Sequence, residues 1–159
     1  MNEIIMPQHD IVVPKGHVTI VLGDKYGNIK EVQHYRNLIT DLAKASIADG
    51  LRGTTTNNKG IITYCSLGTD ATAPDPTDTT LGTEIFRKLV SVRSVADNVA
   101  TFQTYFATGD ANGTLREAGL FGDDASETAD SGTLFAHTAI NRVKTSNDTL
   151  TLYWDVTIG

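Results

Sequence analysis

The stretch of sequence that decides the fold is TLTLYWDVTI, residues 149–158. Apolar and polar side chains alternate along it, and successive side chains of a β-strand point to opposite faces of a sheet. One face of such a strand collects Leu150, Leu152, Trp154, Val156 and Ile158. The alternation therefore predicts a strand with one buried face, on which Trp154 is the expected core anchor.

Further strands are predicted outward from this one by the same period and by a frequent use of threonine. β-Branched residues suit the pleated, half-buried surface of a sheet. We expect these strands at residues 17–22, 29–32, 60–67, 84–95, 99–108, 114–121 and 133–140. The connections between them are rich in turn-forming residues, among them the acidic stretch 122–132 and the loop 69–80, which contains Pro74 and Pro76.

One segment departs from the strand period. Within residues 35–51, apolar side chains recur at a spacing of three to four residues, and Gly50 and Gly53 follow as a stop signal. The residues concerned are Leu38, Ile39, Leu42, Ala45 and Ile47. This spacing predicts one amphipathic α-helix near residues 35–51. The expected fold is mainly β, an antiparallel β-sandwich of about seven to eight strands with this helix packed on it.

The N-terminus is expected to be separate from the sandwich. We divide the chain into an extended arm, residues 1–14, and a single β-sandwich-like domain, residues 15–159. The arm carries little turn chemistry, and its apolar residues lie between or beside two prolines. It can serve as an edge strand or as an arm that pairs with a neighbouring subunit. The candidate contact residues of the arm are Ile4, Ile5, Ile11, Val12 and Val13.

Composition and charge argue against several classes of protein. The 159 residues are 40% hydrophobic and 20% charged, which suits one domain with a real core. Thirteen Lys and Arg against 19 Asp and Glu give a net charge of −6, which disfavours a nucleic-acid partner. One cysteine excludes an internal disulfide, and no signal peptide or membrane-spanning run is recognisable. We therefore expect no membrane association.

No catalytic or cofactor motif is recognisable. The four histidines lack metal-ligand spacing, and Cys65 lies in an apolar strand, where a cysteine is usually a small hydrophobic residue. Asp110 with Asn112, and the acidic loop 123–130, offer oxygen ligands for calcium, but turn formation explains both stretches. We expect a protein that is not an enzyme and binds no cofactor.

Arg116 and Glu117 are adjacent in a predicted strand, so their side chains point to opposite faces. One of them must face the buried side or a subunit contact, and a buried charge requires a partner. We therefore predict an ion pair across strands, with Glu84 or Arg87 as candidate partners. Its expected role is to set strand register and the specificity of assembly.

The order of short motifs along the chain resembles a known family. The motifs are YRNLIT at 35–40, a strand ending in LGTD at 67–70, TLGTE at 80–84, REAGLF at 116–121, GTLFAHT at 132–138 and the final strand at 149–158. This succession, over roughly residues 35–158, is similar to the N-terminal domains of tail-collar and tail-fibre proteins of tailed bacteriophages.

The resemblance implies a non-enzymatic structural protein of the virion, made in the cytoplasm of the host bacterium. Such a protein acts by homo-oligomerisation, as a trimer or hexamer, and by docking to other phage virion proteins of the tail, neck or capsid. A complete fibre would continue into heptads or β-helical repeats, whereas this sequence ends at Gly159 after its last strand. We expect a tail, collar or baseplate adaptor or a fibre-attachment piece. The alternatives are a capsid decoration (cement) protein and a carbohydrate-binding β-sandwich module.

Overall fold

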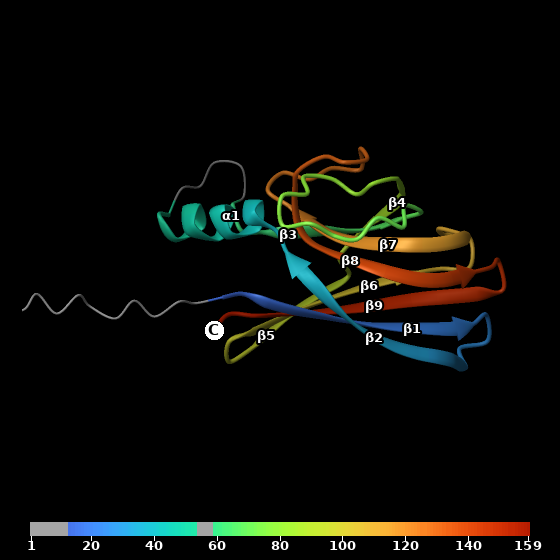
Figure 1. Ribbon diagram of the computed structural model, residues 1–159. Coiled ribbons are helices and arrows are strands. Elements are labelled where there is room, and N and C mark those ends of the chain that lie inside the picture. Colours follow the sequence, from blue (N-terminus) through green and yellow to red (C-terminus); the bar gives the residue numbers. More distant parts are fainter. Residues whose placement is uncertain (1–12, 54–58) are drawn as a thin grey trace, which may run out of the picture.

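The structure, a computed structural model, describes residues 13–53 and 59–159. In these residues it contains nine strands and one helix (Figure 1). The strands are β1 (Lys15–Asp24), β2 (Ile29–Ile39), β3 (Ile62–Gly68), β4 (Glu84–Leu89), β5 (Val92–Ala96), β6 (Val99–Phe106), β7 (Gly113–Gly122), β8 (Thr133–Lys144) and β9 (Asp148–Thr157), and the helix is α1 (Asp41–Leu51). The prediction of a mainly β protein with one helix is confirmed.

All strand pairs are antiparallel and form one curled sheet in the order β4-β3-β7-β8-β2-β1-β9-β6-β5. The sheet folds over on itself, so that strands β4, β3, β7 and β8 lie above strands β2, β1, β9, β6 and β5 (Figure 1). We call the first set the covered half and the second set the open half. Their facing sides enclose the core, which is the sandwich arrangement that the sequence predicts.

The two halves are joined on both flanks. On one flank β4 runs into β5 through two residues: the Val90 N–H donates to Thr63 O of β3 (2.9 Å), and the Ser91 N–H donates to Gln103 O of β6 (2.8 Å). One continuous segment thus leaves the edge of one half and enters the edge of the other. On the opposite flank β2 pairs with β8 at Leu38 and Ile39, the last two residues of β2.

The core lies between the halves and is built on strand alternation. Along β9 every second residue is buried, and the Trp154 side chain is fully inaccessible to solvent, as the sequence predicts. Opposite it in the register are Val18 on β1 and Phe102 on β6. Ile158, which we expected on the same buried face, follows the end of β9 and is 40% exposed.

The helix begins later than the sequence suggests. Residues 35–39 belong to β2, and α1 starts after Thr40, whose Oγ1 accepts a hydrogen bond from the Ala43 N–H (3.1 Å) and caps the helix. The expectation of a helix from residue 35 is wrong because Leu38 and Ile39 are partners of β8 in the sheet. Their apolar character reflects strand burial, although their spacing from Leu42 imitates a helical period.

The strand boundaries also differ from the predicted ones. The segment 84–95, which we expected as one strand, is β4 and β5 with the bend at Val90 and Ser91 between them. β2 extends through Ile39 and β8 through Lys144, both well beyond the predicted ends. The bend accounts for the larger number of strands than expected, because it divides one continuous segment between two edges of the sheet.

The outer faces of the two halves differ. Helix α1 and the loops 69–83 and 123–132 lie over the covered half (Figure 1). They bury a second, smaller apolar cluster of Tyr64, Leu81, Phe121 and Leu134. Within the described residues no helix or loop packs on the outer face of the open half (Figure 1). In the same residues no helix has the length and apolar composition that crossing a membrane requires.

We predict that Trp154→Ala destabilises the protein by about 3–5 kcal/mol, since it removes a fully buried aromatic side chain from the centre of the core. Urea unfolding followed by far-UV circular dichroism measures the loss. The control is Tyr153→Ala, the next residue on the opposite, solvent-facing side of β9, with an expected loss of about 1 kcal/mol or less. Equal losses for the two variants would contradict the assigned faces of β9.

Candidate functional site

The expected alternation is interrupted at Arg116 and Glu117, because the register with β8 shifts between Leu115 and Glu117. Glu117 is 1% exposed and lies under the loop 69–83 on the outer face of the covered half. Arg116 is partly exposed and donates from Nη1 to Asn141 Oδ1 of β8 (2.7 Å). The partner of Glu117 is His137 on the neighbouring strand β8, with 3.1 Å between Oε2 and Nε2. The predicted pairing with Glu84 or Arg87 is wrong. Arg87 and Glu84 bind each other instead.

The Glu117 carboxylate fastens the loop 69–83 to the sheet. It accepts hydrogen bonds from the backbone N–H groups of Thr83 (2.8 Å), Gly82 (2.9 Å) and Asp70 (3.3 Å). A Cβ on Gly68, at the end of β3, would collide with this carboxylate, so only glycine allows its close approach to the loop. Buried carboxylates are stable in proteins when several donors replace their water.

His137 extends this arrangement to the far side of the loop. Its Nδ1 lies 2.8 Å from Asp78 Oδ2, while its Nε2 faces Glu117. Both ring nitrogens thus lie within hydrogen-bond distance of carboxylates. We call Asp78, His137 and Glu117, with the backbone donors of Gly82 and Thr83, the Glu117 anchor. Its geometry is that of a clamp between loop and sheet.

An open cavity of about 310 Å³ lies beside the Glu117 anchor. It is lined mainly by oxygen-bearing side chains, including Asp70, Thr72, Thr80 and Asp78. The Asp70 carboxylate accepts the Thr72 N–H (2.6 Å), an ordinary turn contact. The contacts that these carboxylates make within the protein explain their positions.

The Glu84–Arg87 pair closes the edge of the covered half. Arg87 binds Glu84 through two donors, Nε (2.5 Å) and Nη2 (2.7 Å), and its guanidinium lies 4.5 Å from the centre of the Phe121 ring. Arg87 Nη1 also donates to Ser126 O (2.9 Å), and Glu84 accepts the Asp130 N–H (3.0 Å). The loop 123–132 is thereby held against the side chains of β4.

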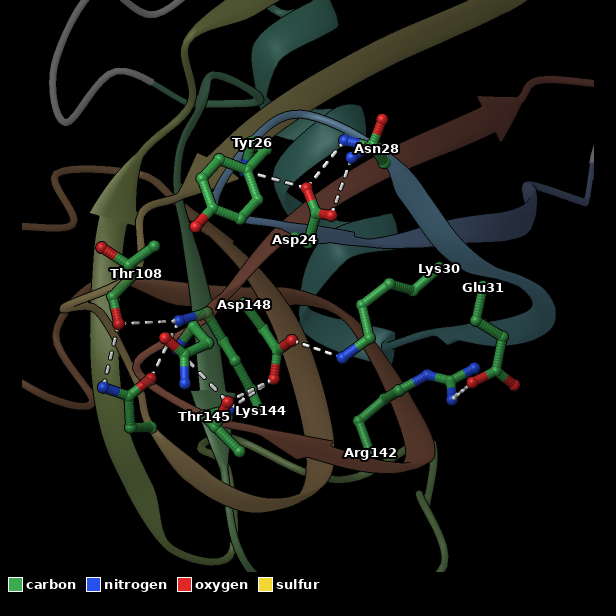
Figure 2. Close-up of polar contacts among 12 residues, drawn as sticks. Asp24, Tyr26, Asn28, Lys30, Glu31, Thr108, Arg142, Lys144, Thr145 and Asp148 are labelled. Carbon is green, nitrogen blue, oxygen red and sulfur yellow. Dashed lines mark hydrogen bonds and ion pairs between the residues drawn. The ribbon is translucent and has the colours of Figure 1, made fainter.

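Charged side chains fill the flank on which β2 and β8 diverge (Figure 2). Arg142 of β8 donates from Nη1 to Glu31 Oε2 of β2 (2.7 Å), and Lys30 Nζ lies 2.6 Å from Asp148 Oδ1 of β9. Inward-facing charges along an incompletely paired strand oppose edge-to-edge aggregation. The hydrogen bond from Lys30, together with those from Thr145, lowers the pKa of Asp148 to about 2.

Lys144, at the end of β8, fastens another loop. Its side chain is buried, and Nζ donates to Ala107 O (2.7 Å) and Asn112 Oδ1 (2.9 Å) in the loop 107–112 (Figure 2). Burial lowers the pKa of Lys144, although the nearby carboxylates of Asp110 and Asp148 act in the opposite direction.

Strand β5 is an edge with little protection. It pairs with β6 on one side, and in the part of the chain that the structure describes no strand pairs with its other side. All five of its residues are exposed, with Val92 at 51% and Val95 at 75%. Its one charged residue, Arg93, is turned back toward the covered half, where Nε donates to Ile62 O (3.0 Å). Such an edge is competent to pair with another strand.

An apolar groove lies where β1 begins, between α1 and the end of β9. It has a volume of about 610 Å³, and its walls are Val13, Pro14, Ile47, Ala48, Leu51 and Ile158, with Lys44 beside them. Val13 of the predicted arm lines this groove and is 45% exposed. Ile4, Ile5, Ile11 and Val12 lie outside the described residues, so their role in an interface remains a prediction.

The other sequence candidates have structural explanations. Burial raises the pKa of the Cys65 thiol to about 12, which makes it a neutral core residue. Asp110 binds Lys88 (2.6 Å), and Asp123 accepts hydrogen bonds from Ser46 (2.7 Å) and the Gly60 N–H (2.8 Å), which ties α1 to the sheet. Among residues 13–53 and 59–159 no group of three or more His, Cys, Asp and Glu is placed to hold a metal ion.

Sequence reasoning missed Asp78 and His137, the other two side chains of the Glu117 anchor. They lie 59 residues apart, and neither belongs to a spacing motif. One available signal was the position of His137 within the apolar run that begins β8, where a polar side chain needs a partner.

A scan of the chain against protein-family models, a search of curated proteins and a search of solved structures each found no match.

We predict that Glu117→Gln lowers the free energy of unfolding by about 1–3 kcal/mol. The amide presents a donor where the carboxylate accepts from Gly82 or Thr83, so one backbone N–H loses its acceptor at the buried Glu117 side chain. Urea unfolding measures the loss, and amide hydrogen exchange at Gly82 and Thr83 should accelerate. Arg116→Gln, at the partly exposed neighbouring position of the same strand, is the control, with an expected change of about 0.5 kcal/mol or less. Unchanged exchange at the loop would contradict the clamp.

A second prediction concerns pH. The pKa of Asp148 is lowered from 3.8 to about 2, so its stabilising contribution is present above about pH 4 and is lost as the pH falls through 2. Asp148→Asn should therefore be less stable at pH 7 and should lose less further stability than the native chain between pH 4.5 and 2. Urea midpoints across this range test the difference. Thr151→Ala, on the outer face of the same strand, removes no titratable group and should retain the native pH dependence.

Proposed function

We propose that this protein is a non-enzymatic structural component of a tailed-phage virion. In this role it is a tail, collar or baseplate adaptor or a fibre-attachment piece, and it acts by self-association and by docking to another virion protein. One observation carries the proposal: the motifs on which the resemblance rests converge in space at the Glu117 anchor, where they make structural contacts.

This convergence involves four motifs from separate parts of the chain. Glu117 comes from REAGLF, His137 from GTLFAHT, and Gly82 and Thr83 from TLGTE. Asp70, the end of LGTD, adds a backbone donor. Proteins with a common scaffold are expected to share the residues that hold that scaffold together. The motifs of the resemblance build one such contact, the Glu117 anchor, and this supports the resemblance.

The distribution of surfaces is also suited to assembly. The covered half is occupied by internal contacts to α1 and two loops, whereas the outer face of the open half carries no packed element in the described residues and ends at the β5 edge. Tyrosine, valine and threonine side chains share this face, among them Val32, Thr151, Tyr105 and Tyr153. A mixed surface of this kind, rich in tyrosine, is typical of protein interfaces.

Docking through the β5 edge has a clear physical basis. A strand of a partner can add to the free backbone groups of β5, as in β-strand addition, without a change in the fold of the sandwich. Trimeric or hexameric self-association and a virion location are parts of the same proposal. A capsid decoration protein would use the same surfaces on a different part of the particle.

The proposal is tested on phage particles banded by density gradient from the source of the sequence. We expect peptides of this chain in the mass spectrum of the particles, and gold-labelled antibodies against the recombinant protein at the tail or neck. Antibodies pre-absorbed with the recombinant protein are the control. Labelling over the capsid would support the decoration alternative. Particles that contain no peptide of this chain would contradict the proposal.

A further inference from the structure

The apolar groove beside α1 is an unusual feature of the surface. Leu51, at the end of the helix, is 85% exposed, and Val13 and Ile158 are 45% and 40% exposed. These side chains come from three segments that are distant in the sequence, and together they line one continuous apolar groove. A contiguous exposed apolar patch with a defined shape commonly marks an interaction site.

The groove continues into a second cavity of different character. This basic cavity has a volume of about 810 Å³ and shares Val13, Pro14 and Lys44 with the groove. Its other lining residues include Lys15, His17 and Arg36. Lys44 is paired with Asp41 (2.8 Å), so Lys15 and Arg36 are the cations that this cavity offers to acidic residues of an occupant.

We propose that residues 3–12 of a second copy of this chain occupy the apolar groove and the basic cavity. This inference rests on the proposed self-association and names its contact. Residues 3–12 have the required composition: Ile4, Ile5, Ile11 and Val12 match the apolar walls, and Glu3 and Asp10 match the basic lining. Their number is also sufficient, since ten extended residues span about 33 Å and the whole of α1 is about 16 Å long.

A second copy is a better occupant than the segment of the same chain. Val13 and Pro14 form part of the groove wall, and a residue before proline is held in the extended region. For its own groove, the segment would have to reverse direction within the residues before Val13, a position that Pro14 restricts to the extended region. A segment from a neighbour can enter the groove without a reversal.

The resulting contact is heterologous, because the arm of one copy meets the groove of the next. Contacts of this kind close into rings when the rotation between copies permits it. Each copy in a ring donates one arm and fills one groove, which agrees with the expected trimer or hexamer.

Two full-length variants test the proposal, one for each side of the contact. Ile5→Asp/Ile11→Asp removes the apolar character of the arm, and Leu51→Lys places a charge in the groove at a highly exposed position. The matched controls are Gln8→Asp in the arm and Leu42→Lys, which lies on α1 outside the apolar groove. Native mass is measured by light scattering behind a sizing column.

We expect the native chain and both controls to form the same oligomer, and each of the two test variants to be monomeric. A mixture of the two test variants should give a 1:1 heterodimer, because one supplies an intact groove and the other an intact arm. A fluorescent peptide of residues 2–12 should bind Ile5→Asp/Ile11→Asp at least ten-fold more tightly than it binds the same variant with Leu51→Lys added.

Each other outcome overturns the inference in a distinguishable way. An oligomer that persists in both test variants would leave self-association standing and reject this contact. A monomeric native chain that excludes the peptide, together with a test variant that binds it through Leu51, would show that the arm fills its own groove. A native chain that is monomeric at all concentrations, with no peptide binding to any variant, would reject both the contact and the proposed self-association.

Discussion

The buried carboxylate of Glu117 accepts the hydrogen bonds that hold the loop 69–83 on the covered half of the sheet. It is nearly inaccessible to solvent, yet it receives three backbone donors and lies beside His137. Without these donors, burial of the charge would cost several kcal/mol. The loop 69–83 therefore cannot leave the sheet without exposing an unpaired carboxylate, and its long path is held to one position although it contains no regular element.

Similar polar contacts hold the other connections in place. The Glu84–Arg87 pair holds the loop 123–132, Lys144 holds the loop 107–112, and Asp123 holds the middle of the helix at Ser46. Each contact places a charged group at an edge or corner where the apolar core ends. The core around Trp154 is apolar, and charged side chains with partners lie at its margins. The β5 edge and the apolar groove are surfaces with few partners within the protein.

The two flanks of the sandwich differ: one is joined by backbone hydrogen bonds, and the other is filled by charged side chains. The β4–β5 bend joins the halves through backbone hydrogen bonds at Val90 and Ser91. The β2–β8 flank is open over most of its length and is filled by Glu31, Arg142, Lys30 and Asp148. Paired charges on this side discourage strand addition, whereas the edge of β5 carries little such protection.

The strands and their buried sides could be read from the sequence, since side-chain alternation is a local property. It determined β9, the orientation of Trp154 and the mainly β class of the fold. The helix start was misjudged because Leu38 belongs to strand β2, where it pairs with β8. Its partner in that pair, His137, lies 99 residues further along the chain. The tertiary structure alone decided that Glu117 meets His137 and Thr83, that 84–95 bends into two edges, and that Val13, Leu51 and Ile158 share one groove. The physical reason is that hydrogen-bond partners and groove walls depend on which distant segments the sheet order brings together, and that order is set by the packing of the whole core rather than by any local pattern.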